Sequence, residues 1–311
     1  MKIAFVFPGQ GAQYVGMAQD FISSYPEFAA VLDEFDARHQ TNLRQIMAEG
    51  PEDVLKETRY TQPAILFHSI CALKCFEEHS PIRPDYVAGH SLGEITALVA
   101  NGTLTWNDAM HLVYKRGEFM IKANEGNPFA MAAVMGLEPQ MVIDICKEAE
   151  KEGLVRAVNF NTPAQTVISG TESGVAKASE LAKAKGAKRV VPLVVGGPFH
   201  TPLIYNASLW LAQEMENIPF KDATIPLISN VDALPNTSGK VSKEKLAKQV
   251  ISPVLWVACV RRMIQDGVDY FIEFGPQKVL SGMIKNIDRD VKVFNVEKKE
   301  DWKAIDEVFK G

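Results

Sequence analysis

A serine placed between glycines is the feature of this sequence best suited to covalent chemistry. The segment Gly89-His90-Ser91-Leu92-Gly93 matches G-x-S-x-G, in which a strained strand-to-helix turn exposes a nucleophilic serine. Glycines are needed there because a side chain at either position would collide with the neighbouring strand or helix. The N–H of Leu92 would then point at the oxyanion that develops during acyl transfer. The pattern favours Ser91 as a nucleophile over an idle serine in a loop.

A serine nucleophile requires a base, and the candidates are the histidines His39, His68, His79, His90, His111 and His200. The first three and His111 lie in polar stretches or helical patterns. His90 adjoins the serine, so we expect its side chain to leave the turn in another direction. His200 lies in the loop Gly196-Gly197-Pro198-Phe199-His200-Thr201-Pro202, and loops held by rigid elements are where catalytic groups concentrate. His200 is therefore the leading candidate for the base.

A second glycine-rich loop, Pro8-Gly9-Gln10-Gly11, follows the first predicted strand. Open α/β folds place their sites at the carboxyl ends of such strands. The backbone N–H of Gln10 is a candidate second donor to the oxyanion, and the alternative is an ordinary tight turn. A nucleotide site is disfavoured because neither G-x-G-x-x-G nor the P-loop pattern is present.

The elements around these loops predict an α/β fold. Lys2–Phe7 is apolar and bounded by turn formers, as in a buried strand. A helix is expected over residues 61–79. Tyr86–Gly89 reads as a strand that leads through the serine turn into a helix over Glu94–Ala100. Strand, tight turn and apolar helix in this order favour a core with a parallel sheet.

The middle of the chain predicts a smaller unit of its own. Strands are expected over Phe129–Gly136, Val155–Phe160, Thr166–Ser169 and Arg189–Val195, with helices over 138–151 and 172–185. The order β-α-β-β-α-β is that of a ferredoxin-like unit. We therefore predict an inserted ferredoxin-like subdomain over residues 127–197 and a core formed by residues 1–126 and 198–311.

Composition excludes several classes of protein. The 311 residues carry a net charge of -5, whereas nucleic-acid-binding proteins are usually basic. The sequence has no apolar run of transmembrane length and no signal-peptide pattern, so no membrane association and a cytoplasmic location are expected. Its four cysteines are scattered, which argues against a disulfide framework. Two of them, Cys71 and Cys75, lie four residues apart on a helical pattern but have no partners at metal-ligand spacing, so no metal site is expected.

Short segments in a fixed order along the chain resemble the malonyl-CoA:acyl carrier protein transacylases. The matching segments are Phe7-Pro8-Gly9-Gln10-Gly11, Thr61-Gln62-Pro63, Gly89-His90-Ser91-Leu92-Gly93-Glu94, Arg116-Gly117, Asn159-Phe160-Asn161, Gly197-Pro198-Phe199-His200, Ser229-Asn230-Val231, Gln249-Val250-Ile251-Ser252-Pro253-Val254 and Glu273-Phe274-Gly275-Pro276. That family combines an α/β-hydrolase-like core with a ferredoxin-like insert, the same architecture that periodicity predicts here.

The resemblance also implies a role for each site residue. Ser91 is expected as the nucleophile and His200 as its base, with the N–H groups of Gln10 and Leu92 as the oxyanion hole. Arg116 is expected to bind the malonyl carboxylate, because a planar guanidinium forms two charge-assisted hydrogen bonds with a carboxylate. Gln249 is expected to support the histidine where hydrolases use an acid, and backbone carbonyls to share in that support.

Further residues in the matching segments bear on the substrate. Gln62, Asn159 and Asn161 are expected to contact it, and Phe199 resembles the form that selects malonyl over methylmalonyl by crowding an α-methyl group. A difference of one methyl group is worth about 1–3 kcal/mol, so this is a preference. Some members of the fatty-acid family lack this phenylalanine and still use malonyl.

The reaction implied is a ping-pong transfer of malonyl from malonyl-CoA to the phosphopantetheine thiol of acyl carrier protein in fatty acid biosynthesis. The coenzyme A thioester is a substrate, no cofactor is required, and the family suggests a monomer. Alternatives are a trans-acting acyltransferase of polyketide synthesis, a serine acyl-thioester hydrolase, and a non-catalytic interaction subunit. Basic candidates for docking the acidic carrier are Arg261-Arg262, Lys285 and Lys188-Arg189, although solvated surface charge is the commoner explanation.

Overall fold

The larger of two β-sheets in this computed structural model, which describes residues 1–310, is almost entirely parallel. Its strands, in spatial order, are β10 (Lys292–Val296), β9 (Tyr270–Phe274), β1 (Ile3–Phe7), β2 (Tyr86–Gly89), β7 (Leu227–Ile228) and β8 (Pro235–Asn236). The predicted parallel sheet is confirmed except at its edge, where β8 runs antiparallel to β7. The short connection between these two strands forces a hairpin, because a parallel pairing needs a long crossover.

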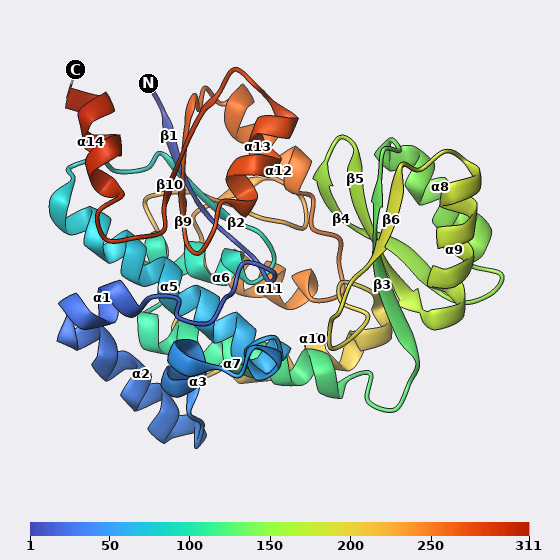
Figure 1. Ribbon diagram of the computed structural model, residues 1–311, viewed down its shortest axis with the longest axis horizontal. Helices are drawn as coiled ribbons and strands as arrows, with labels where there is room; N and C mark the ends of the chain where they lie inside the picture. The colour runs from blue at the N-terminus through green and yellow to red at the C-terminus, as the bar shows by residue number, and fades with distance from the viewer. Residues whose placement is uncertain (311) are drawn as a thin grey trace.

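Strand β1 is buried on both faces, as expected of a central parallel strand. Ile3, Phe5 and Phe7 pack into the main core with helices α5 (Thr58–His79), α6 (Gly93–Ala100) and α7 (Trp106–Lys122). Ala4 and Val6 face the other side, toward α12 (Trp256–Gln265) and α13 (Val279–Ile287). The sheet is thus covered by helices on both faces (Figure 1), and the carboxyl ends of β1 and β2 reach the two glycine-rich loops.

Helix α5 begins at Thr58, three residues before the predicted start, and Pro63 lies inside it. Packing against α7 explains the difference. A Cβ at Gly117 of α7 would lie 3.0 Å from both the Cα of Arg59 and the carbonyl oxygen of Thr58. The glycine therefore lets the first turn of α5 sit directly on α7. Pro63 lacks the N–H that would otherwise donate to the carbonyl four residues earlier.

The four remaining strands form a separate antiparallel sheet in the order β4 (Val155–Thr162), β5 (Gln165–Thr171), β3 (Phe129–Met135) and β6 (Arg189–Pro192). Helices α8 (Pro139–Ala149) and α9 (Glu172–Ala184) cover its outer face and share a hydrophobic cluster with it (Figure 1). Met131 and Ala133 point to the opposite face and join the main core. The α/β fold class with a second, smaller sheet is confirmed. The boundary of the insert at 127–197 stays a prediction.

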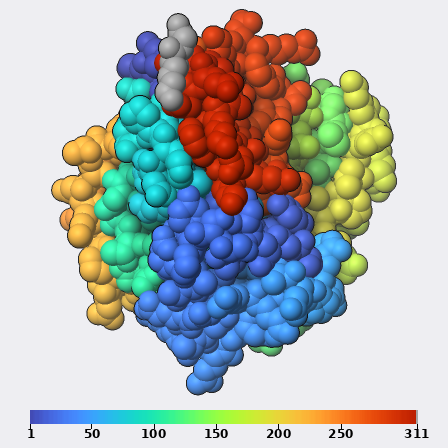
Figure 2. All heavy atoms as spheres, turned by 60° about the vertical axis from the view of Figure 1, so that its left-hand side comes forward, coloured from blue at the N-terminus to red at the C-terminus, as the bar shows by residue number. Residues whose placement is uncertain are grey.

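The remaining helices surround the core: α1 (Gln19–Ser24), α2 (Pro26–His39), α3 (Leu43–Glu49), α4 (Glu52–Leu55), the short 3₁₀ helix Pro202–Ile204, α10 (Tyr205–Met215), α11 (Gly239–Gln249) and α14 (Trp302–Lys310). Figure 2 shows the N-terminal helices in blue adjoining the C-terminal segment in red on one face. The Tyr14 hydroxyl donates to Glu297 over 2.9 Å across this junction. Within residues 1–310, no helix combines the length and hydrophobicity that a bilayer span requires.

Candidate active site

Ser91 sits on a strained turn between β2, which ends at Gly89, and α6, which begins at Gly93. Its φ of 53° lies in the left-handed region, which non-glycine residues rarely adopt. A Cβ at Gly89 would lie 1.9 Å from the carbonyl carbon of Gly93, and one at Gly93 would lie 2.2 Å from the carbonyl oxygen of Phe7. Only glycine fits at either position, as the sequence pattern predicted.

The side chain of Asn230, which follows β7, holds this turn in place. Its Nδ2 donates to the carbonyl of Gly89 over 2.7 Å, and its Oδ1 accepts from the N–H of Ser91 over 2.8 Å. The amide therefore satisfies both backbone groups that the sharp turn leaves unpaired. No role was expected for Asn230, although it lies in Ser229-Asn230-Val231, one of the segments that carry the family resemblance.

His200 lies next to Ser91, with 2.9 Å between its Nε2 and the serine Oγ. Its Nδ1 is 2.9 Å from the carbonyl oxygen of Gln249 and 3.1 Å from that of Ser252. Because carbonyls only accept, Nδ1 must carry the proton and Nε2 is left with a lone pair. Ser91 Oγ can therefore donate to Nε2, which is the arrangement needed for general base chemistry.

The surroundings of His200 favour its neutral form. Burial, followed by the positive charge of Arg116, lowers the pKa of His200 to about 3. The φ of His200 is 62°, and its own N–H donates to the carbonyl of Val250 over 3.1 Å. The imidazole is thus held as an uncharged acceptor facing the serine throughout the neutral pH range.

Arg116 of α7 extends its guanidinium to the same serine and is only 1% exposed. Its Nη2 donates to Ser91 Oγ over 3.0 Å and to Gln249 Oε1 over 2.8 Å, and its Nη1 donates to Gln62 Oε1 over 2.8 Å. Its Nε is buried and has no hydrogen-bond partner among the described residues. Every acceptor is neutral, so the cation lies beside the serine without a directly bonded carboxylate.

Desolvation lowers the pKa of Arg116 to about 10, while the charge of Glu94 acts in the opposite direction. The group therefore stays charged at neutral pH. A buried, unpaired cation is costly in a protein interior. An anionic group of the substrate would relieve that cost, and a planar guanidinium is well matched to a carboxylate.

The side chain of Gln249 contacts Arg116 and not the imidazole, which differs from the supporting role expected of it. The backbone carbonyl of Gln249 accepts from His200, while its Oε1 accepts from Arg116. The difference arises because α11 ends at Gln249, so the carbonyl points away from the helix and toward the histidine loop. One residue thereby holds both the base and the cation.

Two backbone N–H groups lie ready beside the serine. Gln10 and Leu92 both line the cavity at Ser91, and neither N–H donates to a protein acceptor within residues 1–310. A Cβ at Gly9 would lie 2.7 Å from the carbonyl oxygen of His90, so the glycine lets the first loop approach the serine turn closely. Two such free donors, one of them at the N-terminus of α6, can stabilise a developing oxyanion.

A cavity of about 260 Å³ opens over Ser91 between the core and the small sheet. The other predicted substrate contacts, Gln62, Asn159, Asn161 and Phe199, all line it. Their side chains are nearly buried, Phe199 at 6% exposure. All the predicted site residues except Gln249 line this cavity, and Gln249 lies behind it in contact with Arg116 and His200. Much of the remaining lining is apolar.

His90 also lines this cavity. As expected, its side chain leaves the serine turn in another direction, and it reaches the small sheet. Its Nε2 lies 2.8 Å from Oδ1 of Asn161, whose Nδ2 donates to Gln165 over 3.2 Å. The imidazole thereby links the serine turn of the core to strands β4 and β5. Sequence reasoning did not anticipate this contact, and only adjacency to Ser91 hinted at it.

Comparison with known proteins gives matches along nearly the whole chain. Residues 4–300 match the family model described as an acyl transferase domain. A malonyl CoA-acyl carrier protein transacylase of Bacillus subtilis is 45% identical over 300 residues, which cover 96% of this chain and 94% of the relative.

Solved structures agree with this match. The crystal structure of an acyl-carrier-protein S-malonyltransferase from Burkholderia pseudomallei has a TM-score of 0.94 at 39% identity and covers 99% of this chain and 100% of that one. A malonyl-transacylase solved in complex with a type II PKS acyl-carrier protein has a TM-score of 0.94 at 34% identity, with 99% and 100% covered.

Proposed function

This chain belongs to the acyl transferase family, among the malonyl CoA-acyl carrier protein transacylases, and we propose that it carries malonyl from coenzyme A to acyl carrier protein as an ester of Ser91. The observation that carries the proposal is the buried guanidinium of Arg116, which donates to Ser91 Oγ and has no directly bonded carboxylate. A malonyl group on Ser91 would supply that carboxylate two carbon–carbon bonds from the ester carbonyl.

In the first half-reaction, His200 Nε2 takes the Ser91 proton as Oγ bonds to the thioester carbonyl carbon. The N–H groups of Gln10 and Leu92 stabilise the resulting oxyanion. When it collapses, the carbon–sulfur bond breaks and the imidazolium returns its proton to the sulfur of coenzyme A. Malonyl is left esterified to Ser91.

The second half-reaction runs the same steps toward a different thiol. His200 takes the proton of the carrier's phosphopantetheine thiol as its sulfur attacks the ester carbonyl. The bond to Ser91 Oγ breaks, and the imidazolium reprotonates that oxygen. Malonyl leaves as a thioester of the carrier protein, and the enzyme regains its starting protonation state.

Intact mass after brief exposure to malonyl-CoA, acetyl-CoA or methylmalonyl-CoA tests the proposal. We expect a malonyl adduct on the wild-type chain, much less of the other two adducts, and none on Ser91→Ala. Equal labelling by acetyl-CoA would contradict the role given to Arg116. A malonyl adduct that persists in Ser91→Ala would contradict the nucleophile, and the complete absence of an adduct would favour a non-catalytic subunit.

Hydrolysis is the nearest alternative, and the partners of His200 weigh against it. A hydrolase triad places a carboxylate on the base, whereas His200 Nδ1 faces two carbonyls. Two of the acids that follow it in sequence, Asp266 and Asp269, are engaged elsewhere: Asp269 accepts from the N–H of Lys2, before β1 begins, and Asp266 accepts from Arg262. Release of free malonate that pantetheine does not suppress would restore this alternative.

We place the reaction in fatty acid biosynthesis in the cytoplasm, with the enzyme acting as a monomer and without nucleic acid or membrane. Steady-state transfer to fatty-acid and polyketide carrier proteins would separate the two pathways. A carrier of the fatty-acid type should have the higher kcat/KM. Analytical ultracentrifugation at the protein concentration used in the assays tests whether the enzyme is a monomer.

For the carrier dock we favour the exposed basic candidates Arg261, Lys188 and Arg189. Arg262 pairs with Asp266, and Lys285 Nζ donates to the backbone carbonyl of Val291 over 2.6 Å. Arg261→Glu should raise KM for the carrier without changing malonyl-enzyme formation.

A further inference from the structure

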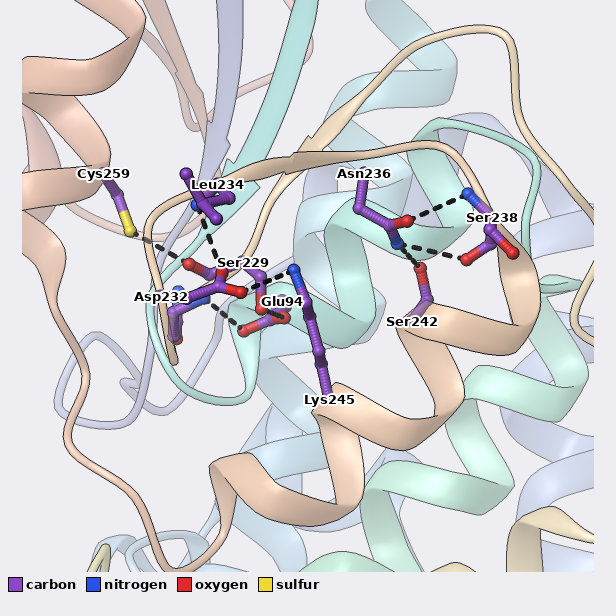
Figure 3. A network of polar contacts seen from close by, with 10 residues as sticks. Glu94, Ser229, Asp232, Leu234, Asn236, Ser238, Ser242, Lys245 and Cys259 are labelled. Carbon is purple, nitrogen blue, oxygen red and sulfur yellow. Dashed lines mark hydrogen bonds and ion pairs between the residues drawn. The ribbon is translucent and has the colours of Figure 1, made fainter.

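Behind the serine turn lies a buried carboxylate that the proposed reaction does not use. Glu94, in the first turn of α6, is 1% exposed. It accepts from Ser229 Oγ over 3.0 Å, from the N–H of Asn230 over 3.1 Å and from Gln249 Nε2 over 2.8 Å. Figure 3 shows Glu94 reaching Ser229 beneath the loop that follows β7. Burial raises the pKa of Glu94, whereas the three donors and the charge of Arg116 favour its ionised form.

These contacts fix which way the amide of Gln249 points. Its Nε2 is surrounded by acceptors: Glu94 Oε2 at 2.8 Å, the carbonyl of Ser91 at 2.9 Å and Asn230 Oδ1 at 3.3 Å. Only the NH₂ end of an amide can occupy such a position. Oε1 must therefore face the other way, where it accepts from Arg116 Nη2 over 2.8 Å.

The side-chain amide of Gln249 also separates the negative charge of Glu94 from the positive charge of Arg116. The charge of Glu94 favours the protonated form of Arg116, yet this amide stands between them. A direct Glu94–Arg116 pair would occupy the N–H groups of the guanidinium. The intervening amide supplies a counter-charge while leaving the guanidinium free to bond to a carboxylate beside Ser91.

We infer that Glu94 is a positioning residue for malonyl selection: through Gln249 it aims the guanidinium of Arg116 at the acyl group on Ser91. This inference rests on the proposed function, because it presupposes that Arg116 binds the malonyl carboxylate. It assigns Glu94 no contact with substrate.

Glu94→Gln keeps the shape of the side chain and removes its charge. The new NH₂ group can face the Ser229 hydroxyl, which is able to accept, so Gln249 Nε2 is left with a neutral carbonyl in place of the charged acceptor that fixes its orientation. Because hydrogen bonds to charged groups contribute about 1.5–3 kcal/mol, the preference for malonyl-CoA over acetyl-CoA should fall by roughly ten- to hundredfold. The kcat/KM for acetyl-CoA should change much less.

Glu273→Gln provides a matched control. Glu273 is a second fully buried carboxylate, which accepts from the N–H groups of Leu280 and Ser281 at the start of α13. Loss of this charge should lower the melting temperature, as the loss of any buried carboxylate would. The ratio of kcat/KM for malonyl-CoA to that for acetyl-CoA should stay unchanged. Gln249→Met removes the link but keeps the Glu94 carboxylate, and it should reproduce the ratio seen for Glu94→Gln.

The experiment measures kcat/KM for malonyl-CoA and acetyl-CoA in the wild type, Glu94→Gln, Gln249→Met, Arg116→Met, the double variant Glu94→Gln/Arg116→Met and the control. If Glu94 acts through Arg116, the double variant has the same ratio as Arg116→Met alone. The inference is overturned if Arg116→Met loses the preference while Glu94→Gln or Gln249→Met retains it. If Arg116→Met itself retains the preference, the proposed function fails instead. Should Glu94→Gln not fold, Gln249→Met decides alone.

Discussion

Nη2 of Arg116 donates to Oγ of Ser91 over 3.0 Å, and the same oxygen lies 2.9 Å from Nε2 of His200. The nucleophile thus contacts the cation and the base of the proposed reaction at the same time. Because the guanidinium donates to Oγ, it also stabilises negative charge on that oxygen as the proton leaves. Arg116 should therefore affect the reactivity of the serine as well as the binding of malonyl.

Replacing Arg116 by alanine should lower kcat/KM for malonyl-CoA, because the substrate carboxylate then has no charged partner in a buried site. The loss should correspond to about 2–5 kcal/mol of transition-state stabilisation. Acetyl transfer should fall less. Lys115→Ala, on the same helix but paired with Glu118 near the surface, is the control and should have little effect. The measurement is single-turnover acylation with each thioester. A uniform loss for both acyl groups would reject the carboxylate contact.

The pH profile of serine acylation should lack the usual histidine inflection near 6.5. Burial and Arg116 lower the pKa of His200 to about 3, so the base stays neutral as the pH falls through 6 and 5. Since Arg116 is the second cause, Arg116→Met should move the acid limb to higher pH, though not as far as 6.5. Stopped-flow acylation between pH 4.5 and 8 tests this. An inflection near 6.5 in the wild type would refute it.

Phe199→Ser should raise kcat/KM for methylmalonyl-CoA relative to malonyl-CoA, because the ring lines the acyl cavity and limits the room for an α-methyl group. The change in the ratio should correspond to about 1–3 kcal/mol. Phe199→Leu retains most of the bulk and serves as the control. Gly197 packs against this ring, with its Cβ position 3.0 Å from a ring carbon. Competition between the two thioesters, read by intact mass, gives the ratio of methylmalonyl to malonyl adducts directly. If Phe199→Ser leaves this ratio unchanged, the ring does not determine the selectivity.

Gly93→Ala should prevent stable folding or lower the melting temperature sharply, because its Cβ would lie 2.2 Å from the carbonyl oxygen of Phe7. Gly282→Ala is the matched control. That glycine lies inside α13 with no neighbouring atom within 4 Å of its Cβ position. The control should gain up to about 1 kcal/mol of stability, since alanine favours the helix. Thermal melts of both variants decide, and a well-folded Gly93→Ala would contradict the close packing described here.

The sequence predicted the parts of the site that local rules control. The glycine spacing around Ser91 and the apolar strand before it sufficed for the serine turn, and the β-α-β-β-α-β order sufficed for the second sheet. Edge strands were harder to predict. No strand was expected over Lys292–Val296, and β8 has only two residues. Such short edges depend on a neighbouring strand more than on their own periodicity.

The roles of Arg116, Asn230 and Glu94 could not be read from their own neighbourhoods in the sequence. Lys115-Arg116-Gly117 looks like a solvated helix face, and only the resemblance singled out the arginine. It is buried because Gly117 lets α5 approach α7. Asn230 meets Ser91 across 139 positions of the chain, and Glu94 meets Gln249 across 155. Contacts of this kind exist only once the sheet has brought the loops together.

The small sheet is tied by its backbone to the loop that orients the imidazole. The N–H of Val254 donates to the carbonyl of Val158 over 2.7 Å, and the N–H of Phe160 donates back to Val254 over 3.0 Å. Two residues earlier in that loop lies Ser252, one of the carbonyls that orient His200. If the insert swung outward like a lid, it would pull on this loop and disturb the tautomer on which proton transfer depends. We therefore expect the thioesters of coenzyme A and of the carrier to reach Ser91 without an outward movement of the small sheet.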